Sequence, residues 1–354
     1  MDGQLHGVGQ VVYENGEEYK GEWVRGKRHG HGVYMYNDGS KFDGQWENDK
    51  INGIGTSWYP NGNVYAGEWV NGRINGKGTL TLAAGHRYEG DWVDGKRSGH
   101  GTYYYADGDT YVGGWHNDER HGKGIMTYAG GEDGANERYE GEFALGKMGG
   151  RGTYYFADGS VYDGHWEDGK MHGRGIFTYP NGNRYDGEFA DDQKEGHGTL
   201  TYVNGEKYEG AWKANFAHGL GSLFFTDGDR YTGMWDQGKK SGEGELCYAN
   251  GDVFKGVWID DRAAGHGVLE YANGDTYDGA WFDDEREGHG IFTSQETSMV
   301  YEGTWKNGRK HGHGKLTLPG GEVIIGDFQD GLPSSTGPLQ FHFAEGSPWN
   351  DPEY

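Results

Sequence analysis

The sequence predicts an all-β protein: an elongated, twisted, single-layer antiparallel meander, in which about fifteen β-hairpin repeats stack like a solenoid into a rod. Three observations predict it. An aromatic-x-Gly-x-aromatic motif recurs every 23 residues, tight-turn pairs such as Asn-Gly occur twice in each period, and aromatic residues reach 15% in a chain that is only 33% hydrophobic. One unit of this size cannot bury its own apolar face, so neighbouring units must stack.

The motif begins at fourteen positions, and eleven of the thirteen intervals between them are 23 residues, the exceptions being 28 and 24. The starting residues are Tyr19, Phe42, Tyr65, Tyr88, Tyr111, Tyr139, Tyr162, Tyr185, Tyr208, Tyr231, Phe254, Tyr277, Tyr301 and Ile324. We number each starting residue as position 0 of its repeat.

The first strand of each repeat carries positions 0, +2 and +4 on one face, because side chains alternate along a strand. Tyr65, Gly67 and Trp69 are an example, and the glycine lets aromatic rings lie across its backbone. Position +4 is Trp in eleven repeats and Phe in three. A ring that recurs in every repeat indicates a structural ladder rather than a cofactor site.

Turn residues follow at +6/+7 and again at +19/+20, as in Asn71-Gly72 and Asn61-Gly62, and they predict two short strands per repeat. Between them, Gly-x-Gly occurs at +11 and +13 in thirteen of the fourteen repeats. No Gly-Lys-Ser/Thr follows, and the pair recurs throughout, so a phosphate-binding loop is rejected. About 30 strands at roughly 4.7 Å would give a rod on the order of 140 Å long.

Composition limits the function classes. The net charge of −24 argues against bulk binding to nucleic acid, and no stretch has the length or hydropathy of a membrane span. The N-terminus lacks the features of a signal peptide, and Cys247 is the single cysteine, so we expect a cytoplasmic protein. We expect no cofactor and no enzymatic activity, because no Ser, Cys or carboxylate is distinguished from its equivalents in other repeats.

Histidine pairs raise the question of a metal site. His29 and His31 share one strand face, as do His311 and His313. With one cysteine in the chain, a structural zinc site within one molecule is disfavoured, while a site across a dimer stays open. We expect no metal.

The segments Tyr88–Gly101 and Tyr162–Gly175 read Tyr-x-Gly-x-Trp-x-x-Gly-Lys-x-x-Gly-x-Gly and resemble the MORN (membrane occupation and recognition nexus) repeat. The resemblance covers residues 1–343: an N-terminal half-unit and fourteen full or near-full units. It leaves a Pro-rich tail at 344–354. The unit from Ile324 departs from the pattern, because it lacks the starting aromatic residue and has Ser335 in place of a glycine.

An array of MORN units with no other domain resembles the all-MORN scaffold proteins of protozoan parasites, which belong to the kinetoplastid hook complex at the flagellar pocket neck or to the apicomplexan budding ring. The resemblance implies a homodimeric scaffold, association with cytoskeletal proteins near the plasma membrane, and binding of phosphatidylinositol phosphates. The alternative is a membrane–cytoskeleton tether whose main activity is phosphoinositide binding.

Basic residues gather at positions +8 and +9, which hold sixteen of the 32 Lys and Arg residues. Aligned along a rod, they predict a basic stripe that binds phosphoinositide headgroups or an acidic partner. The candidate residues are Lys27, Arg28, Lys96, Arg97, Lys239, Lys240, Arg309 and Lys310. The alternative is a solvated loop in which these cations pair with aspartates at +6 and +7.

The repeat is interrupted in three places: an insertion at 132–136, a replaced turn at 294–299, and the C-terminal segment. In the last, Leu339, Phe341 and Phe343 alternate as in a strand, followed by Trp349. Such a strand at the open end of the sheet must be capped by the tail or paired with a second chain. The resemblance favours the second, so these four residues are the candidate dimer interface.

Overall fold

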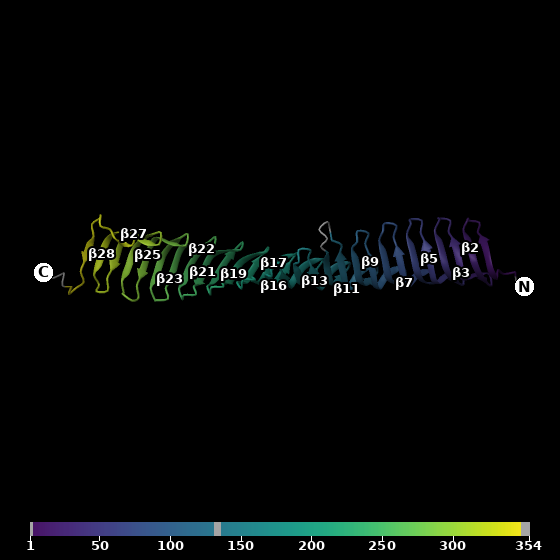
Figure 1. Cartoon of the computed structure of the whole chain (residues 1–354), viewed down its shortest axis with the longest axis horizontal. Coiled ribbons are helices and arrows are strands. Elements are labelled where there is room, and N and C mark those ends of the chain that lie inside the picture. The colour runs from purple at the N-terminus through teal and green to yellow at the C-terminus, as the bar shows by residue number, and fades with distance from the viewer. Residues whose placement is uncertain (1–2, 131–135, 348–354) are drawn as a thin grey trace. The chain divides into compact units, whose positions relative to one another are not determined.

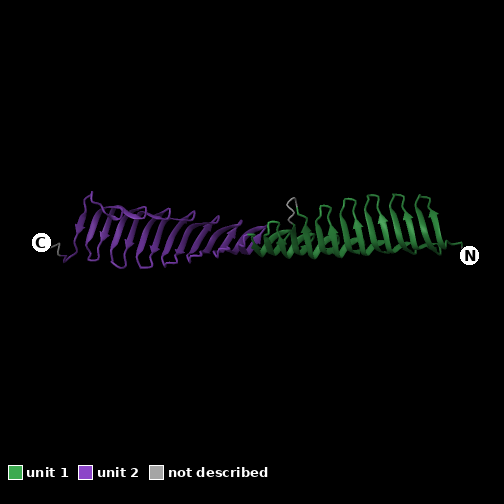
Figure 2. Ribbon diagram, in the orientation of Figure 1, with its two compact units in different colours: residues 1–180 green, residues 181–354 purple. Residues whose placement is uncertain are grey.

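The computed structural model describes residues 3–130 and 136–347. This part of the chain holds thirty β-strands and no helix, which confirms the predicted antiparallel β-meander (Figure 1). The chain divides into two units, residues 1–180 and 181–354 (Figure 2).

In the first unit, each strand pairs antiparallel with the next one in the sequence, from β1 through to β15. Its strands are β1 (Gly7–Val12), β2 (Glu18–Val24), β3 (Lys27–Met35), β4 (Lys41–Glu47), β5 (Lys50–Trp58), β6 (Val64–Val70), β7 (Arg73–Thr81), β8 (Arg87–Val93), β9 (Lys96–Tyr104), β10 (Thr110–His116), β11 (Glu119–Tyr128), β12 (Glu137–Ala144), β13 (Lys147–Tyr155), β14 (Val161–Glu167) and β15 (Lys170–Thr178).

The second unit repeats this pattern from β16 to β28, and β28 then pairs with both β29 and β30. Its strands are β16 (Arg184–Ala190), β17 (Gln193–Thr201), β18 (Lys207–Lys213), β19 (Phe216–Phe224), β20 (Arg230–Asp236), β21 (Lys239–Cys247), β22 (Val253–Ile259), β23 (Arg262–Glu270), β24 (Thr276–Phe282), β25 (Glu285–Thr293), β26 (Val300–Lys306), β27 (Arg309–Thr317), β28 (Val323–Gln329), β29 (Leu332–Pro333) and β30 (Gln340–His342).

The predicted turn chemistry is present between the two strands of each hairpin. Asn71 and Gly72 both have positive φ, 50° and 82°, as a type I′ turn requires, and the Asn48–Asp49 pair does the same at 48° and 68°. The aspartate variants of the turn therefore keep its backbone conformation.

Glycine and a buried aromatic ring, usually tyrosine, form the core of each repeat that begins with an aromatic residue. Tyr65 is fully buried, and its ring lies over Gly67 and Gly78, which face each other on β6 and β7. A Cβ atom placed on Gly78 would lie 2.1 Å from the Tyr65 hydroxyl oxygen. The hydroxyl donates to the carbonyl oxygen of Glu68 at 3.2 Å, so the polar end of the buried ring is satisfied.

Tryptophans link one repeat to the next. The Trp69 ring packs edge-on against Tyr65 of its own repeat at 5.3 Å and against Phe42 of the preceding repeat at 5.5 Å, measured between ring centroids. Its indole Nε1 donates to the carbonyl oxygen of Gly55 on the preceding repeat at 3.3 Å. Each repeat is thus buried mainly against its neighbours, as expected for a repeat array.

Candidate functional site

The aromatic ladder carries a second layer of cations, supplied by position +9. The Arg28 guanidinium carbon lies 4.5 Å above the ring of Trp46, and Arg97 lies at the same distance above Trp115. In the second unit the same arrangement joins Lys194 to Trp212, Lys240 to Trp258 and Arg286 to Trp305, at 4.5, 4.3 and 4.4 Å. Each cation covers the tryptophan of the next repeat and is attracted by its π-electrons.

An aspartate at +7 of the next repeat completes this arrangement. Asp49 accepts hydrogen bonds from the Arg28 backbone N–H at 2.9 Å and from its side-chain Nε at 3.4 Å, and its carbonyl oxygen accepts from Nη2 at 3.1 Å. Asp118 binds Arg97 in the same three ways, at 3.0, 3.1 and 3.0 Å. The guanidinium of each arginine is therefore held by a ring, a carboxylate and a backbone carbonyl.

Position +8 lies on the opposite face of the sheet and pairs with the aspartate at +6 of the next repeat. Lys147 and Lys239 contact Asp168 and Asp260, each at 3.1 Å, and Arg309 contacts Asp330 at 3.7 Å. The sequence analysis placed +8 and +9 in one stripe. The structure divides them into two rows, because neighbouring residues on a strand point to opposite faces.

The eight candidate stripe residues thus differ in their surroundings. Arg28, Arg97, Lys240 and Lys310 lie against aromatic rings, the last of them 5.0 Å above Tyr301. Lys239 and Arg309 form the ion pairs just described. Lys27 and Lys96 are exposed, and within the described part of the chain they make no ion pair.

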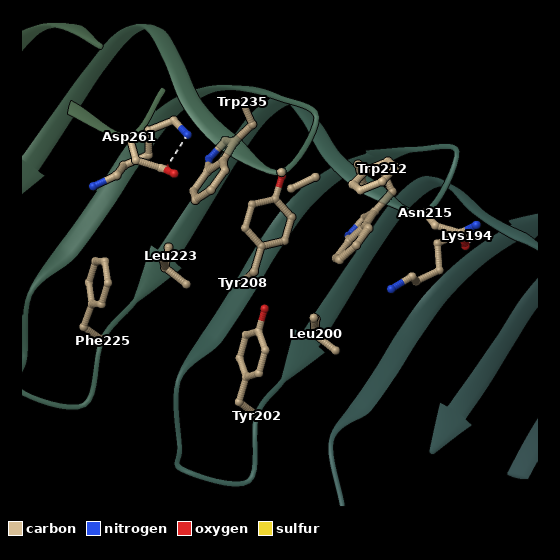
Figure 3. A pocket seen from close by; sticks show the side chains of 14 residues that line it. Lys194, Leu200, Tyr202, Tyr208, Trp212, Asn215, Leu223, Phe225, Trp235 and Asp261 are labelled. Carbon is tan, nitrogen blue, oxygen red and sulfur yellow. Dashed lines mark hydrogen bonds between the residues drawn. The ribbon is translucent and has the colours of Figure 1, made fainter. Parts of the chain in front are cut away.

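The cation layer of the second unit is interrupted where position +9 is alanine, at Ala217 and at Ala263. An open hollow of about 500 Å³ lies beside Ala217. Trp235, Tyr208, Leu223 and Phe225 line this hollow (Figure 3). Lys194 on β17 and Lys240 on β21 also line it, from the two sides of β19, which carries Ala217. Sequence reasoning missed this site; its signal in the sequence is an alanine at a position where most repeats have a larger side chain.

Burial shapes the charge of the two lysines that line the hollow. It lowers the pKa of Lys194 to about 8, and it also lowers the pKa of Lys240 despite the nearby carboxylates of Asp261 and Asp284. Burial raises the pKa of the Tyr208 phenol. Near neutral pH, the hollow therefore offers an apolar floor between two ammonium groups that have lost part of their hydration.

Replacing Lys194 by methionine should stabilise the protein at neutral pH. Because the folded-state pKa of about 8 lies below the unfolded value, the charged form is penalised below pH 8, and the penalty disappears as the pH rises toward 10.5. Lys194→Met should raise the free energy of unfolding by about 1 kcal/mol at pH 7, a figure discounted for solvent screening, and by much less at pH 10.

Thermal denaturation at the two pH values measures this effect, with Lys239→Met as the control, because that lysine is exposed on the other face. A gain for Lys194→Met that is equal at both pH values would contradict the assignment.

At the C-terminal end, the predicted strand exists as β30. Ile324 of β28 faces Phe341, and Leu339 packs on Gly326, where a Cβ atom would lie 2.6 Å from a Leu339 methyl group. The chain thus covers part of its own sheet edge. Phe341 and Phe343 are 54% and 40% exposed, and Trp349 lies outside the described residues.

The other sequence features are placed as follows. Of the insertion at 132–136, only Asn136 lies within the described residues; its side-chain oxygen accepts a hydrogen bond from the Gly130 N–H at 2.7 Å. In the replaced turn at 294–299, the Ser294 N–H donates to the Met299 carbonyl oxygen at 2.9 Å. Within the described ranges, no group of His, Cys, Asp or Glu side chains is arranged to hold a metal ion.

A membrane-spanning helix is not found among residues 3–130 and 136–347. Comparison with protein families gives fourteen matches to the MORN repeat, at residues 1–18, 19–41, 42–64, 65–87, 88–110, 111–132, 139–161, 162–184, 185–207, 208–230, 231–253, 254–276, 277–296 and 301–323. The unit beginning at Ile324 is not among these matches. Comparison with curated proteins finds no match.

Among solved structures, the chain is similar to the TCP domain of Drosophila melanogaster SAS-4 (dCPAP) in complex with a proline-rich motif of Ana2 (dSTIL), at 17% identity, covering 50% of this chain and 90% of that one, with a TM-score of 0.28. It is also similar to the TCP10 domain of Danio rerio CPAP in complex with a STIL peptide, at 12% identity, 82% and 98% coverage and a TM-score of 0.22. TM-scores this low support no functional argument.

Proposed function

Because this chain belongs to the MORN-repeat family, we propose that it is a non-enzymatic, homodimeric scaffold of a membrane-associated cytoskeletal structure. Several proteins dock along its repeats, and phosphoinositide binding is an additional activity. The matched family is defined by a structural repeat and not by a catalytic site. The observation that carries the docking proposal is the hollow at Ala217.

The hollow has the properties of a protein-docking site. Leu223 and Phe225, both partly exposed, supply apolar surface, and open apolar surface beside polar groups marks interaction sites. The amine of Lys194 favours an anionic group at its side of the hollow, whereas the carboxylate of Asp261 lies beside Lys240 at the other side. The occupant that fits is a partner segment with an apolar or aromatic side chain next to an aspartate or glutamate.

Proximity labelling of the tagged protein in its own cell tests the scaffold proposal. We expect several cytoskeletal proteins to be enriched together over a tag-only control, because a scaffold holds more than one partner at once. Enrichment of no cytoskeletal protein would contradict the proposal.

The homodimer is proposed to form at the C-terminal end. Its support is the apolar side chains that remain exposed there, Phe341 and Phe343, beside the short strand β30. Light scattering of the full chain should give twice the single-chain mass of 39.2 kDa. The double variant Phe341→Ser, Phe343→Ser should weaken the dimer about tenfold or more, because it removes two exposed apolar side chains that the dimer would bury. An unchanged dimer in this variant would place the interface elsewhere.

The lipid-tether alternative has weaker support. Most cations of the predicted stripe have carboxylate or ring partners within the chain, as Arg28, Arg97 and Lys239 show. A headgroup would have to compete with these aspartates, on a chain whose net charge is −24. Lys27 and Lys96 are exposed, so their ammonium groups could contact a headgroup, and we retain phosphoinositide binding as an additional activity.

A further inference from the structure

Within each unit, an aspartate at position +7 of one repeat contacts position +9 of the preceding repeat. Where +7 is aspartate, its carboxylate oxygen accepts the backbone N–H of the +9 residue: Asp49 from Arg28, Asp118 from Arg97 and Asp261 from Lys240, at 2.9, 3.0 and 2.8 Å. Where +7 is glycine, no such carboxylate is present, and the preceding +9 residue is either apolar, as at Ile51 and Ala217, or a cation, as at Arg286.

Asp284 departs from this pairing. It accepts the N–H of Ala263 at 2.7 Å, so its backbone geometry matches the other aspartates, but the residue it faces has no cationic side chain. The comparison covers the described aspartates at +7 whose preceding repeat lies in the same unit. Among them, Asp284 alone faces a +9 residue that is neither arginine nor lysine. Its carboxylate and its carbonyl oxygen correspond to the two acceptors that hold Arg28 and Arg97.

The third element of the arginine site is also present. Trp281 occupies +4 of the same repeat, where Trp46 and Trp115 lie beneath the guanidinium groups. Ten of the eleven tryptophans at this position are between 3% and 7% exposed, whereas Trp281 is only partly buried. We call Trp281, the Asp284 carboxylate and the Asp284 carbonyl oxygen the 281–284 slot.

Neighbouring cations have other partners. Arg262 contacts Asp283 on the opposite face, and Arg286 donates to the Gly308 carbonyl oxygen at 2.6 Å while its guanidinium covers Trp305. Lys240 covers Trp258 and donates its backbone N–H to Asp261. None of these side chains makes a hydrogen bond or ion pair with Asp284 in the described structure.

We propose that the 281–284 slot binds the guanidinium of an arginine side chain supplied by a partner protein. A planar guanidinium can stack on the indole while its N–H groups, held in a fixed fork, reach the carboxylate and the carbonyl oxygen. The same three groups hold Arg28 and Arg97 in this chain, and the net charge of −24 attracts a basic partner. This deepens the proposed docking function by naming the chemistry of one docking site, and the probe experiment below is independent of whether the chain is a scaffold.

The test uses the full chain and the peptide acetyl-Gly-Arg-Gly-amide, with the citrulline peptide as its uncharged match. Nuclear magnetic resonance of 19F-labelled tryptophan follows the Trp281 signal, which is assigned by its loss in Trp281→Phe. We expect the arginine peptide to shift this signal saturably and the citrulline peptide to leave it unchanged. Equal shifts with both peptides would overturn the proposal, because charge would then play no part.

Two variants distinguish a loss of arginine binding at the 281–284 slot from a loss of folding. Asp284→Asn removes the charge but keeps the backbone acceptor, as Asn215 does for the Lys194 N–H at 2.9 Å, and should weaken arginine binding roughly tenfold. Ala263→Arg should fill the slot as Arg97 does, raise the thermal midpoint and abolish the peptide-induced shift. Unchanged binding in either variant, or a lower midpoint in Ala263→Arg, would overturn the proposal.

Discussion

Replacing Gly152 by alanine is expected to destabilise the protein by about 3 kcal/mol, since overpacking a filled site forces neighbouring atoms to move. A Cβ atom on Gly152 would lie 2.3 to 2.5 Å from three atoms of the Tyr139 ring and hydroxyl. Tyr139 is fully buried, and its hydroxyl is held by the carbonyl oxygen of Glu142 at 2.9 Å, so it cannot move aside. In a repeat array the damage should centre on the repeats that contact the site.

Gly149 on the same strand, β13, is the matched control. A Cβ atom there would meet its nearest neighbour, the Ala144 Cβ, at 3.5 Å, which is an ordinary contact. Gly149→Ala should therefore be neutral or slightly stabilising, because alanine loses less backbone entropy than glycine in a strand. Denaturant titration measures both variants, and hydrogen exchange locates the damage. Similar stabilities for the two would contradict the role given to the glycine pairs.

Much of the fold could be predicted from the sequence, because the same short-range features recur in each repeat. The alternation of Tyr65, Gly67 and Trp69 gives the buried face, and Asn71-Gly72 gives the turn. Each of these features acts within one hairpin or between adjacent hairpins. Reading one repeat therefore predicts the others, and the antiparallel pairing of the structure follows.

The candidate site was predicted less well, because it depends on contacts between repeats. The sequence predicted one stripe containing both Lys239 and Lys240. In the structure they lie on opposite faces of the strand, where Lys239 forms an ion pair with Asp260 and Lys240 lies over the ring of Trp258. No binding site was predicted at Ala217 or Ala263. An alanine at +9 indicates an uncovered ring only once the structure shows that the equivalent residues cover one. The functional meaning of an alanine at +9 is therefore inferred from the ring contacts of Arg28 and Arg97 in the structure.

Replacing Ala217 by arginine is expected to abolish docking at the hollow while leaving the fold intact. The chain already shows how such a residue is accommodated when the next +7 residue is glycine: Arg286 covers Trp305 and donates to the Gly308 carbonyl oxygen. At 217, an arginine would cover Trp235 in the same way and donate to the Gly238 carbonyl oxygen. The hollow between Lys194 and Lys240 would then be filled by the chain's own side chain.

Ile51→Arg is the matched control for that variant. It adds the same charge at the same position of another repeat, where the following +7 residue is also a glycine, Gly72, and where +9 is a buried isoleucine and not an alanine. Any loss of binding that arises from added positive charge alone would appear in both variants. If partner binding is lost in Ala217→Arg and kept in Ile51→Arg, the partner docks at the hollow.

Features common to every repeat build the sheet, and we propose that the places where the pattern is broken bind partners. The decisive measurement is quantitative proximity labelling of the wild-type protein, Ala217→Arg and Ile51→Arg in the same cells. We expect the labelling of at least one cytoskeletal partner of the wild-type protein to fall about tenfold or more with Ala217→Arg and to be unchanged with Ile51→Arg. Identical partner profiles for all three proteins would contradict this proposal.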